Sequence, residues 1–318
     1  MTGSGVNSVN TKEISPEYLS EWLEVPLAIA SKSLEDTPRA SMNFIIPDTS
    51  DQLRILKETH RKLEFMMTKP SSDSKRKNWE SQWQRVSERV AAEGVSEESL
   101  RPAYFNRKML RLRGTYVHGL DASFAYSLHL TILRVLFLHH LQGATSYTEL
   151  GSGTGINLLL LSKLFPGAAF LGTDWSKNSL QLMDAIGAAR DVNLEGRGLD
   201  LKTMEGGETI QVPPDGVILT IHALEQIGVR YESVLSFLLA QPARVVFHLE
   251  PLVELYDATA NFDILASAYH RHLGYLEGYL PTLQKLEKKG IIEIVECKRL
   301  GFGDVWHEAY GLVIWRRS

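Results

Sequence analysis

The sequence predicts an α/β fold: a seven-stranded, mostly parallel sheet with an antiparallel C-terminal strand, preceded by a helical N-terminal cap. Three observations predict this fold. Strand-like and helical runs alternate from residue 144 onward, a glycine-rich turn joins the first such strand to the first such helix, and the last two strands lie close together in the chain. Upstream, the pattern is helical. We therefore expect a cap and acceptor-binding region at 1–142 and a cofactor-binding core at 143–318.

Four helices are expected before the glycine turn. Ser15 and Pro16 open the first, in which apolar residues recur at helical spacing as far as Ala30. Asp48 begins a stretch that caps the second, and Gly94 ends the third. The predicted helices cover 16–30, 48–67, 73–93 and 122–141, with a loop at 35–50.

The segment 101–122 is aromatic but has no strong periodicity, and we expect it to enter the site beneath the cap. A cap of this kind excludes water and shapes an acceptor pocket. The segment also carries a basic cluster, for which a solvated face or ion pairs between the two regions are expected, with contact to a phosphate as the alternative. The aromatic residues are Tyr104, Phe105, Tyr116 and His118, and the basic cluster is Arg101, Arg107, Lys108, Arg111 and Arg113.

Seven strands are expected in the core. Helices fall between the first five, which predicts a parallel sheet with helices on both faces. The break at 301–304 is too short for a crossover, so the last two strands should form a hairpin and the seventh strand should be antiparallel. The predicted strands are 145–150, 168–173, 194–198, 215–221, 243–249, 290–299 and 309–316.

The glycine turn contains Gly151, Gly153 and Gly155, and Glu149 precedes it. Glycines without a Cβ let a ligand approach the backbone, and the start of the following helix offers free N–H groups. The next strand ends on Asp174, where a ribose diol would be bound. A carboxylate at Glu149 would repel the pyrophosphate of a nicotinamide or flavin cofactor, but it would attract the sulfonium and ammonium groups of S-adenosylmethionine (SAM).

At these residues the chain resembles the class I SAM-dependent methyltransferases, whose first motif is an acid followed by three alternating glycines. The resemblance covers roughly residues 144–318. It implies that Glu149 and the three glycines hold the methionine end of SAM and that Asp174 binds the ribose hydroxyls. It also implies that Trp175 packs on adenine, and that Asp200, with Leu201 beside it, reads the adenine amino group.

The chemistry should lie at the carboxyl ends of the strands, where open α/β sheets bind their ligands. Methyl transfer needs an aligned nucleophile and, for a hydroxyl or ammonium group, a base. His222, after the fourth predicted strand, is the first candidate for that base, and Glu225 could orient it or hold the acceptor. Glu250 and His307 are the next candidates. Gln226 could instead face the cofactor. Each of these residues could equally have only a structural role.

Composition limits the partners, the cellular compartment and the metal sites that we expect. The net charge of −4 gives no general attraction to nucleic acid or to an anionic membrane. The single cysteine, Cys297, excludes an internal disulfide and is expected to be buried. The start of the chain does not look like a secretory signal, so a cytoplasmic protein is expected, with a homodimer left open. No metal site is expected, because the pairs His139–His140 and His270–His272 have no carboxylate at ligand spacing and should lie at the surface or between helices.

The function expected from these features is methyl transfer from SAM to an oxygen or nitrogen of a metabolite, glycan or peptide. A sugar hydroxyl of a glycan or natural product is preferred because the loops are rich in carboxylates, and a peptide side-chain amide is the alternative. Residues 220–223 lack the Asp/Asn-Pro-Pro-aromatic motif of enzymes that methylate amino groups of nucleic acids. A SAM-binding regulator without catalysis and a nicotinamide oxidoreductase are the competing classes.

Overall fold

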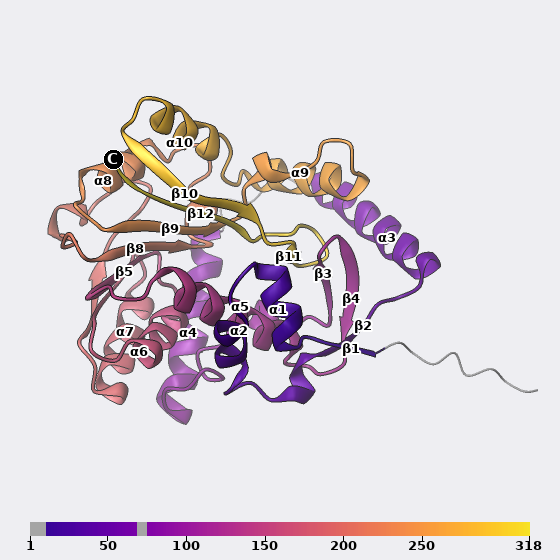
Figure 1. The fold of residues 1–318 in the computed structure, drawn as a ribbon, viewed down its shortest axis with the longest axis horizontal. Coiled ribbons are helices and arrows are strands. Elements are labelled where there is room, and N and C mark those ends of the chain that lie inside the picture. Colours follow the sequence, from indigo (N-terminus) through magenta and orange to yellow (C-terminus); the bar gives the residue numbers. More distant parts are fainter. Residues whose placement is uncertain (1–10, 69–74) are drawn as a thin grey trace, which may run out of the picture.

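The computed structural model describes residues 11–68 and 75–318, and a seven-stranded sheet forms its centre (Figure 1). The strand order is β7-β6-β5-β8-β9-β12-β10. The first five of these strands are parallel, whereas β12 is antiparallel to both of its neighbours. The expected sheet is therefore confirmed. The strands are β5 Ser146–Leu150, β6 Ala169–Asp174, β7 Leu194–Gly198, β8 Val217–Ile221, β9 Val245–Glu250, β10 Ile292–Arg299 and β12 Gly311–Arg317.

Helices cover both faces of the sheet, and this explains why its central strands are mostly buried. Every residue of β8 is buried, as a strand covered on both faces requires. Helices α5, α6 and α7 lie on one side of the sheet, and α8 and α10 lie on the other (Figure 1). The core helices are α5 Phe124–His140, α6 Ile156–Leu164, α7 Lys177–Arg190, α8 Glu232–Ala240, α9 Asn261–Leu273 and α10 Tyr279–Lys288.

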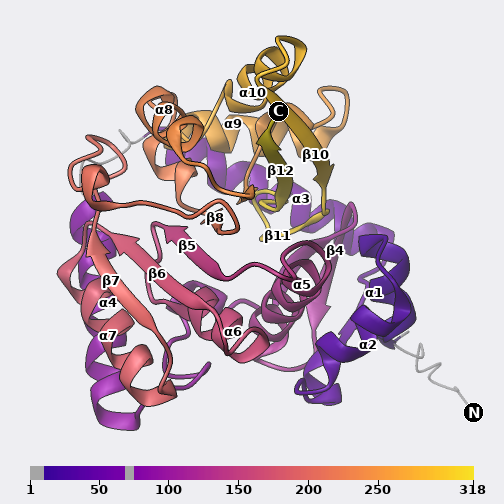
Figure 2. The same cartoon turned by 60° about the vertical axis from the view of Figure 1, so that its left-hand side comes forward.

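The strand order reverses between β5 and β8, and this reversal positions the site. From β5 the chain proceeds outward through β6 to β7 and then returns to place β8 on the other side of β5, with Glu149 opposite Leu219 (Figure 2). In open α/β sheets the crevice at such a reversal is where ligands bind. The glycine turn after β5 and the loop after β8 therefore meet at the same edge of the sheet.

The N-terminal region differs from the expectation at its first helix, which is two helices. α1 (Pro16–Leu23) ends because Glu24 takes a left-handed conformation with φ of 57°, and Pro26 then precedes α2 (Leu27–Leu34). The periodic apolar residues belong to both helices, so periodicity alone did not reveal the break. The second and third expected helices are found as α3 (Thr49–Met67) and α4 (Lys75–Glu93). The start of the third prediction, residues 73–74, lies outside the described residues.

The N-terminal region is not helical alone, because it also contains an antiparallel sheet with the order β1-β2-β4-β3-β11. The aromatic segment 101–122 forms the β3–β4 hairpin of this sheet, and part of the expected loop at 35–50 forms β2. Most of these strands are too short to show an alternating pattern. β11 comes from the loop between β10 and β12, far away in sequence. The strands are β1 Thr11–Glu13, β2 Asn43–Ile45, β3 Met109–Leu112, β4 Thr115–Gly119 and β11 Phe302–Gly303.

The two expected regions share one hydrophobic core. Side chains of α1 and β2, such as Leu19 and Phe44, belong to the same buried cluster as Leu158 of α6 and Phe247 of β9. α5 also contributes to this cluster, so the chain from 124 to 140 packs as part of the core. The division at residue 142 stays a prediction.

Two further features concern single elements. Cys297 is exposed rather than buried, because it lies on β10 at the edge of the sheet. Among the described residues, no helix has the length and apolar character needed to cross a membrane.

Candidate active site

A cavity of about 400 Å³ lies where the sheet reverses its strand order. The glycine turn, the end of β6, the loop after β8 and the loop before β12 line it. Residues of the N-terminal region close it from the other side, among them Trp79, Trp83 and Tyr104. The cap that the sequence predicted thus contributes directly to the walls.

The glycine turn has backbone conformations that favour glycine. Gly151, Gly153 and Gly155 have φ values of 76°, 54° and 77°, which lie in the left-handed region. A Cβ at Gly151 would lie 2.6 Å from the Cβ of Ala223, and one at Gly155 would lie 2.6 Å from Ile186. The turn therefore needs glycine for both conformation and space.

Glu149 lies behind this turn with its carboxylate almost completely buried, at 1% exposure. One oxygen accepts a hydrogen bond from the side-chain amide of Asn157 at 2.6 Å. The other oxygen, Oε2, and the amide oxygen of Asn157 have no hydrogen-bond partner among the described residues. Burial raises the pKa of Glu149 to about 8. Asn157 lines the cavity, whereas Glu149 lies behind it and is not part of the lining. The role of Glu149 in binding the methionine end of SAM stays a prediction.

Asp174, at the end of β6, supports the turn from the other side. One of its carboxylate oxygens accepts from the Gly153 N–H at 3.0 Å, and the other accepts from the Ser176 N–H at 2.9 Å. Its burial raises its pKa, although backbone hydrogen bonds oppose this effect. Asp174 lines the cavity, and its contact with a ribose stays a prediction.

An arginine of the N-terminal region occupies the place expected for adenine. Arg76 of α4 lies 4.3 Å above the ring of Trp175, and its guanidinium pairs with Asp200 at 2.8 Å. Both residues expected to contact adenine are therefore engaged by the same side chain. Leu201 also lines the cavity, close to Gly151. Sequence reasoning missed Arg76, since α4 is remote from the glycine turn in the chain.

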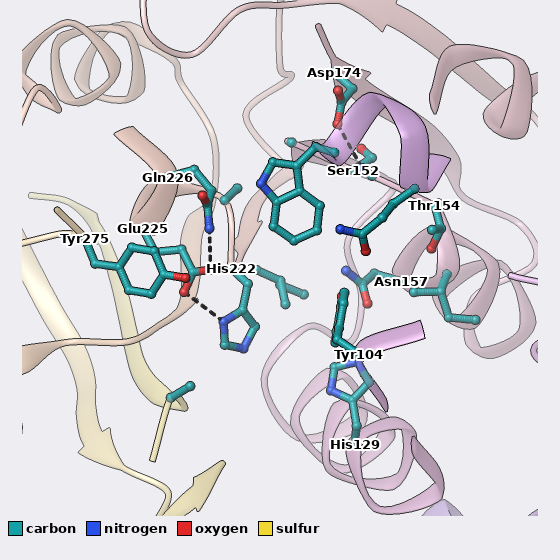
Figure 3. A pocket seen from close by; sticks show the side chains of 18 of the residues that line it. Tyr104, His129, Ser152, Thr154, Asn157, Asp174, His222, Glu225, Gln226 and Tyr275 are labelled. Carbon is teal, nitrogen blue, oxygen red and sulfur yellow. Dashed lines mark hydrogen bonds and ion pairs between the residues drawn. The ribbon is translucent and has the colours of Figure 1, made fainter. Parts of the chain in front are cut away.

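His222 lies at the centre of the cavity, between Glu225, Gln226 and Tyr275 on one side and Tyr104 on the other (Figure 3). Its Nδ1 contacts a Glu225 oxygen at 3.3 Å, and the other Glu225 oxygen accepts from Gln226 at 2.7 Å. The His222 Nε2 has no hydrogen-bond partner among the described residues. The backbone of His222 has a φ of 54°, which directs the loop sharply away from β8. The two predicted residues His222 and Glu225 are thus brought together.

The charges around His222 favour its protonated form. Burial by itself would lower its pKa, but the hydrogen bond and charge of Glu225, followed by the charges of Glu250 and Asp304, raise it. A base is most effective when its pKa lies near the working pH. The raised pKa strengthens His222 as a proton acceptor.

Glu250 does not reach the cavity, contrary to its predicted catalytic role. Its carboxylate is fully buried and accepts hydrogen bonds from the backbone N–H groups of Ala223, Leu224 and Glu225, at 3.0, 3.0 and 3.2 Å. Burial, followed by the charge of Glu225, raises its pKa to about 7. Glu250 therefore fixes the loop that carries His222 rather than touching a ligand.

His307 lines the cavity, its catalytic role stays a prediction, and its partner is unexpected. Its Nδ1 lies 2.7 Å from Nε2 of His270, which also contacts the hydroxyl of Tyr256. His270 was expected at the surface or between helices; it is only 2% exposed and contacts the loop before β12 through His307. Burial lowers the pKa of both histidines to about 3, so the pair is neutral.

The sequence missed most of the aromatic wall. The segment 101–122 gave the signal for Tyr104 and Phe105, which do line the cavity, whereas Tyr116 and His118 do not. His129, a polar residue within an apolar helix, was another available signal. Four further aromatic residues of the lining were not identified as site residues from the sequence: Tyr269, Tyr275, Phe302 and Tyr310.

The basic cluster of 101–113 forms ion pairs with other segments. Arg107 pairs with Asp304, and Arg111 lies 3.4 Å from Glu308, so both connect the N-terminal region to the loop before β12. Arg113 lies 3.9 Å from Glu21. Among the described residues, no group of three or more histidine, cysteine, aspartate or glutamate side chains could hold a metal ion.

No protein-family model and no curated protein matches the chain. Similar solved structures include the N-terminal domain of EvdMO1 in the presence of S-adenosylhomocysteine (SAH) and D-fucose, which is 16% identical with a TM-score of 0.40 over 59% of this chain and 82% of that one. The 16S rRNA methylase ArmA is 14% identical with a TM-score of 0.43, over 74% and 98%. The mycolic acid cyclopropane synthase CmaA1, complexed with SAH and CTAB, is 17% identical with a TM-score of 0.40, over 55% and 65%.

The strand order and the glycine turn of this chain carry the assignment of its fold. A seven-stranded sheet with one antiparallel strand inserted between the fifth and sixth, and a turn with an acid and three alternating glycines after the first strand, define the class I SAM-dependent methyltransferase fold. The chain has this fold, as the motif predicted.

Proposed function

We propose that this protein transfers a methyl group from SAM to an oxygen or nitrogen of a polar acceptor, with His222 as the general base. The observation that carries the proposal is the unpaired Nε2 of His222 inside the cavity, on a ring whose other nitrogen is oriented by Glu225. Such a nitrogen can take the proton of an acceptor placed against it.

The cofactor would be held by groups on the other side of the cavity. The unpaired amide oxygen of Asn157 would accept from its ammonium group, Glu149 would orient Asn157 from behind, and Asp174 would face its ribose. SAM supplies an electrophilic methyl carbon on a sulfonium leaving group. Glu225 orients the His222 ring, Gln226 holds Glu225, and the tryptophans of α4 help to exclude water.

The sugar hydroxyl that the sequence favoured is one candidate acceptor. It was preferred because of the carboxylates in the loops, but two of these are engaged elsewhere: Glu250 binds three backbone N–H groups and Asp304 pairs with Arg107. A peptide side-chain amide and SAM binding without catalysis are the alternatives. Turnover that is unchanged in His222→Ala would contradict the role of base.

The first test is calorimetry of the full chain with SAM, SAH and NAD. We expect saturable micromolar binding of SAM and SAH and none of NAD. The protein is then incubated with SAM and a panel of amines, phenols and monosaccharides, and SAH formation is measured. His222→Asn, which keeps a polar side chain, should bind SAH normally but form none. Tight binding of NAD without SAM would overturn the proposal.

A further inference from the structure

The part of the cavity around His222 is enclosed by aromatic rings from three separate segments. The ring of Tyr310 lies 4.7 Å from that of His222 and 4.7 Å from that of Phe302. On another side, Tyr269 and Tyr275 of α9 and the following loop lie 6.2 Å apart, and Tyr269 lies 5.0 Å from His307. Tyr104 of the N-terminal region completes the lining. We call this set of residues the aromatic cage: Tyr104, Tyr269, Tyr275, Phe302 and Tyr310.

One carboxylate within this aromatic cage, Glu225, has no lysine or arginine partner among the described residues, and His222 is the ionisable side chain that contacts it. Asp304 is paired with Arg107 and accepts from two backbone N–H groups, so its charge is compensated. Glu225 receives one hydrogen bond from the neutral amide of Gln226 and one long contact from His222, and no lysine or arginine of the described residues forms an ion pair with it. Its side chain is only 10% exposed.

The charge of Glu225 acts on the tyrosines that surround it. Burial and then this charge raise the pKa of Tyr104 and of Tyr275, which belong to segments far apart in the chain. The interior of the aromatic cage is therefore a region of negative potential bounded by the faces and edges of aromatic side chains. Aromatic faces and a carboxylate attract an organic cation, and they give a neutral sugar no comparable advantage.

We propose that the aromatic cage and Glu225 form a binding site for a cationic acceptor, an aliphatic ammonium group whose nitrogen receives the methyl group. This inference rests on the proposed function and names its acceptor class. The ammonium proton passes to Nε2 of His222 and leaves a lone pair on nitrogen. The new C–N bond then forms as the C–S bond of the sulfonium breaks, SAH leaves, and His222 returns its proton to solvent. The product is an N-methylammonium ion, which is again a cation.

The test is calorimetric binding of tetramethylammonium chloride to the protein loaded with SAH, at an ionic strength matched with sodium chloride. Neopentyl alcohol is the neutral probe of similar size, and methyl glucoside represents the sugar. We expect saturable tetramethylammonium binding about tenfold tighter than that of neopentyl alcohol, the scale of a desolvated cation–aromatic contact. Methyl glucoside should bind no better than the neutral alcohol.

Two variants separate the contributions of charge and aromatic surface. Glu225→Gln keeps the size of the side chain and should lose the preference for the cation, while Tyr275→Leu should weaken both the cation and the neutral probe. Glu232→Gln is the matched control, because Glu232 is an exposed carboxylate at the start of α8. SAH affinity should be unchanged in all three variants, which shows that the fold is intact.

Equal affinity for the cation and the neutral alcohol would overturn the inference, as would cation binding that is unchanged in Glu225→Gln. Tighter binding of methyl glucoside would favour the sugar hydroxyl instead. Repeating the titrations on the protein without SAH separates failure of this inference from failure of the proposed function. A lack of SAH binding would contradict the use of SAM, whereas the preference for the cation can be measured without SAH.

Discussion

Replacing Arg76 with alanine should strengthen binding of SAH. In the structure this guanidinium stacks on Trp175 at 4.3 Å and pairs with Asp200 at 2.8 Å, so adenine can reach the two residues only after displacing it. A cation–aromatic contact at this exposure is worth about 0.5–1 kcal/mol and the ion pair about 0.2–1 kcal/mol. Removing both contacts in advance should tighten SAH binding by about 0.7–2 kcal/mol, or roughly 3–30-fold.

Calorimetry with SAH and with adenosine measures this effect. Because Arg76 would compete only for the adenine end, adenosine should gain affinity by the same factor as SAH. Arg85→Ala is the control, since Arg85 is exposed on the same helix and its loss changes the net charge equally. Unchanged affinity would show that adenine does not contact Trp175 and Asp200. Weaker affinity would show that Arg76 binds the cofactor itself.

Three further substitutions test other groups of the site. Glu250→Gln leaves a single acceptor oxygen for three backbone N–H groups, so unfolding in urea should become easier by about 1–3 kcal/mol, and kcat should fall while SAH affinity does not. Glu149 has its pKa raised from 4.5 to about 8, so the free energy of unfolding of the free protein should fall between these pH values, because the folded state keeps a proton that the unfolded chain releases. Glu149→Gln should flatten this dependence and abolish proton release on SAH binding at pH about 6.5, measured by calorimetry in two buffers. Asp174→Ala should weaken SAM by about 1–3 kcal/mol, and unchanged affinity would remove Asp174 from the ribose role.

The sequence allowed the core to be predicted because its signals are local. A glycine turn needs left-handed backbone at Gly151, Gly153 and Gly155 wherever it occurs, and alternating strands and helices leave a periodic pattern. The loop after β8 was found in the same way, since strand ends in a parallel sheet meet at one edge. His222 and Glu225 were identified from position alone, before any contact between them was known.

The remainder depends on contacts that no local pattern encodes. β11 is two residues long and joins a sheet of the N-terminal region only because the loop before β12 reaches it. Glu250 was predicted as catalytic because it follows a strand, but its carboxylate turns toward backbone N–H groups whose direction depends on the left-handed His222. His270 is buried because α9 places it against His307 and Tyr256. Each of these features depends on tertiary contacts between segments that are distant in the sequence.

The glycine turn and the loop that carries Phe302 and Tyr310 are held in place by different parts of the molecule. The turn is fixed within the core, by Asp174 and the glycines. The loop that carries Phe302 and Tyr310 is instead fixed by contacts outside the large sheet: β11 pairs with β3, and Glu308 receives Arg299 from β10 and Arg111 from β3. Glu308 is only 3% exposed. Loss of either arginine partner would therefore lower the stability of the fold more than loss of an ion pair at the surface would. In the proposed function, the N-terminal region would therefore shape the acceptor site through this loop, while the glycine turn would bind the cofactor from within the core.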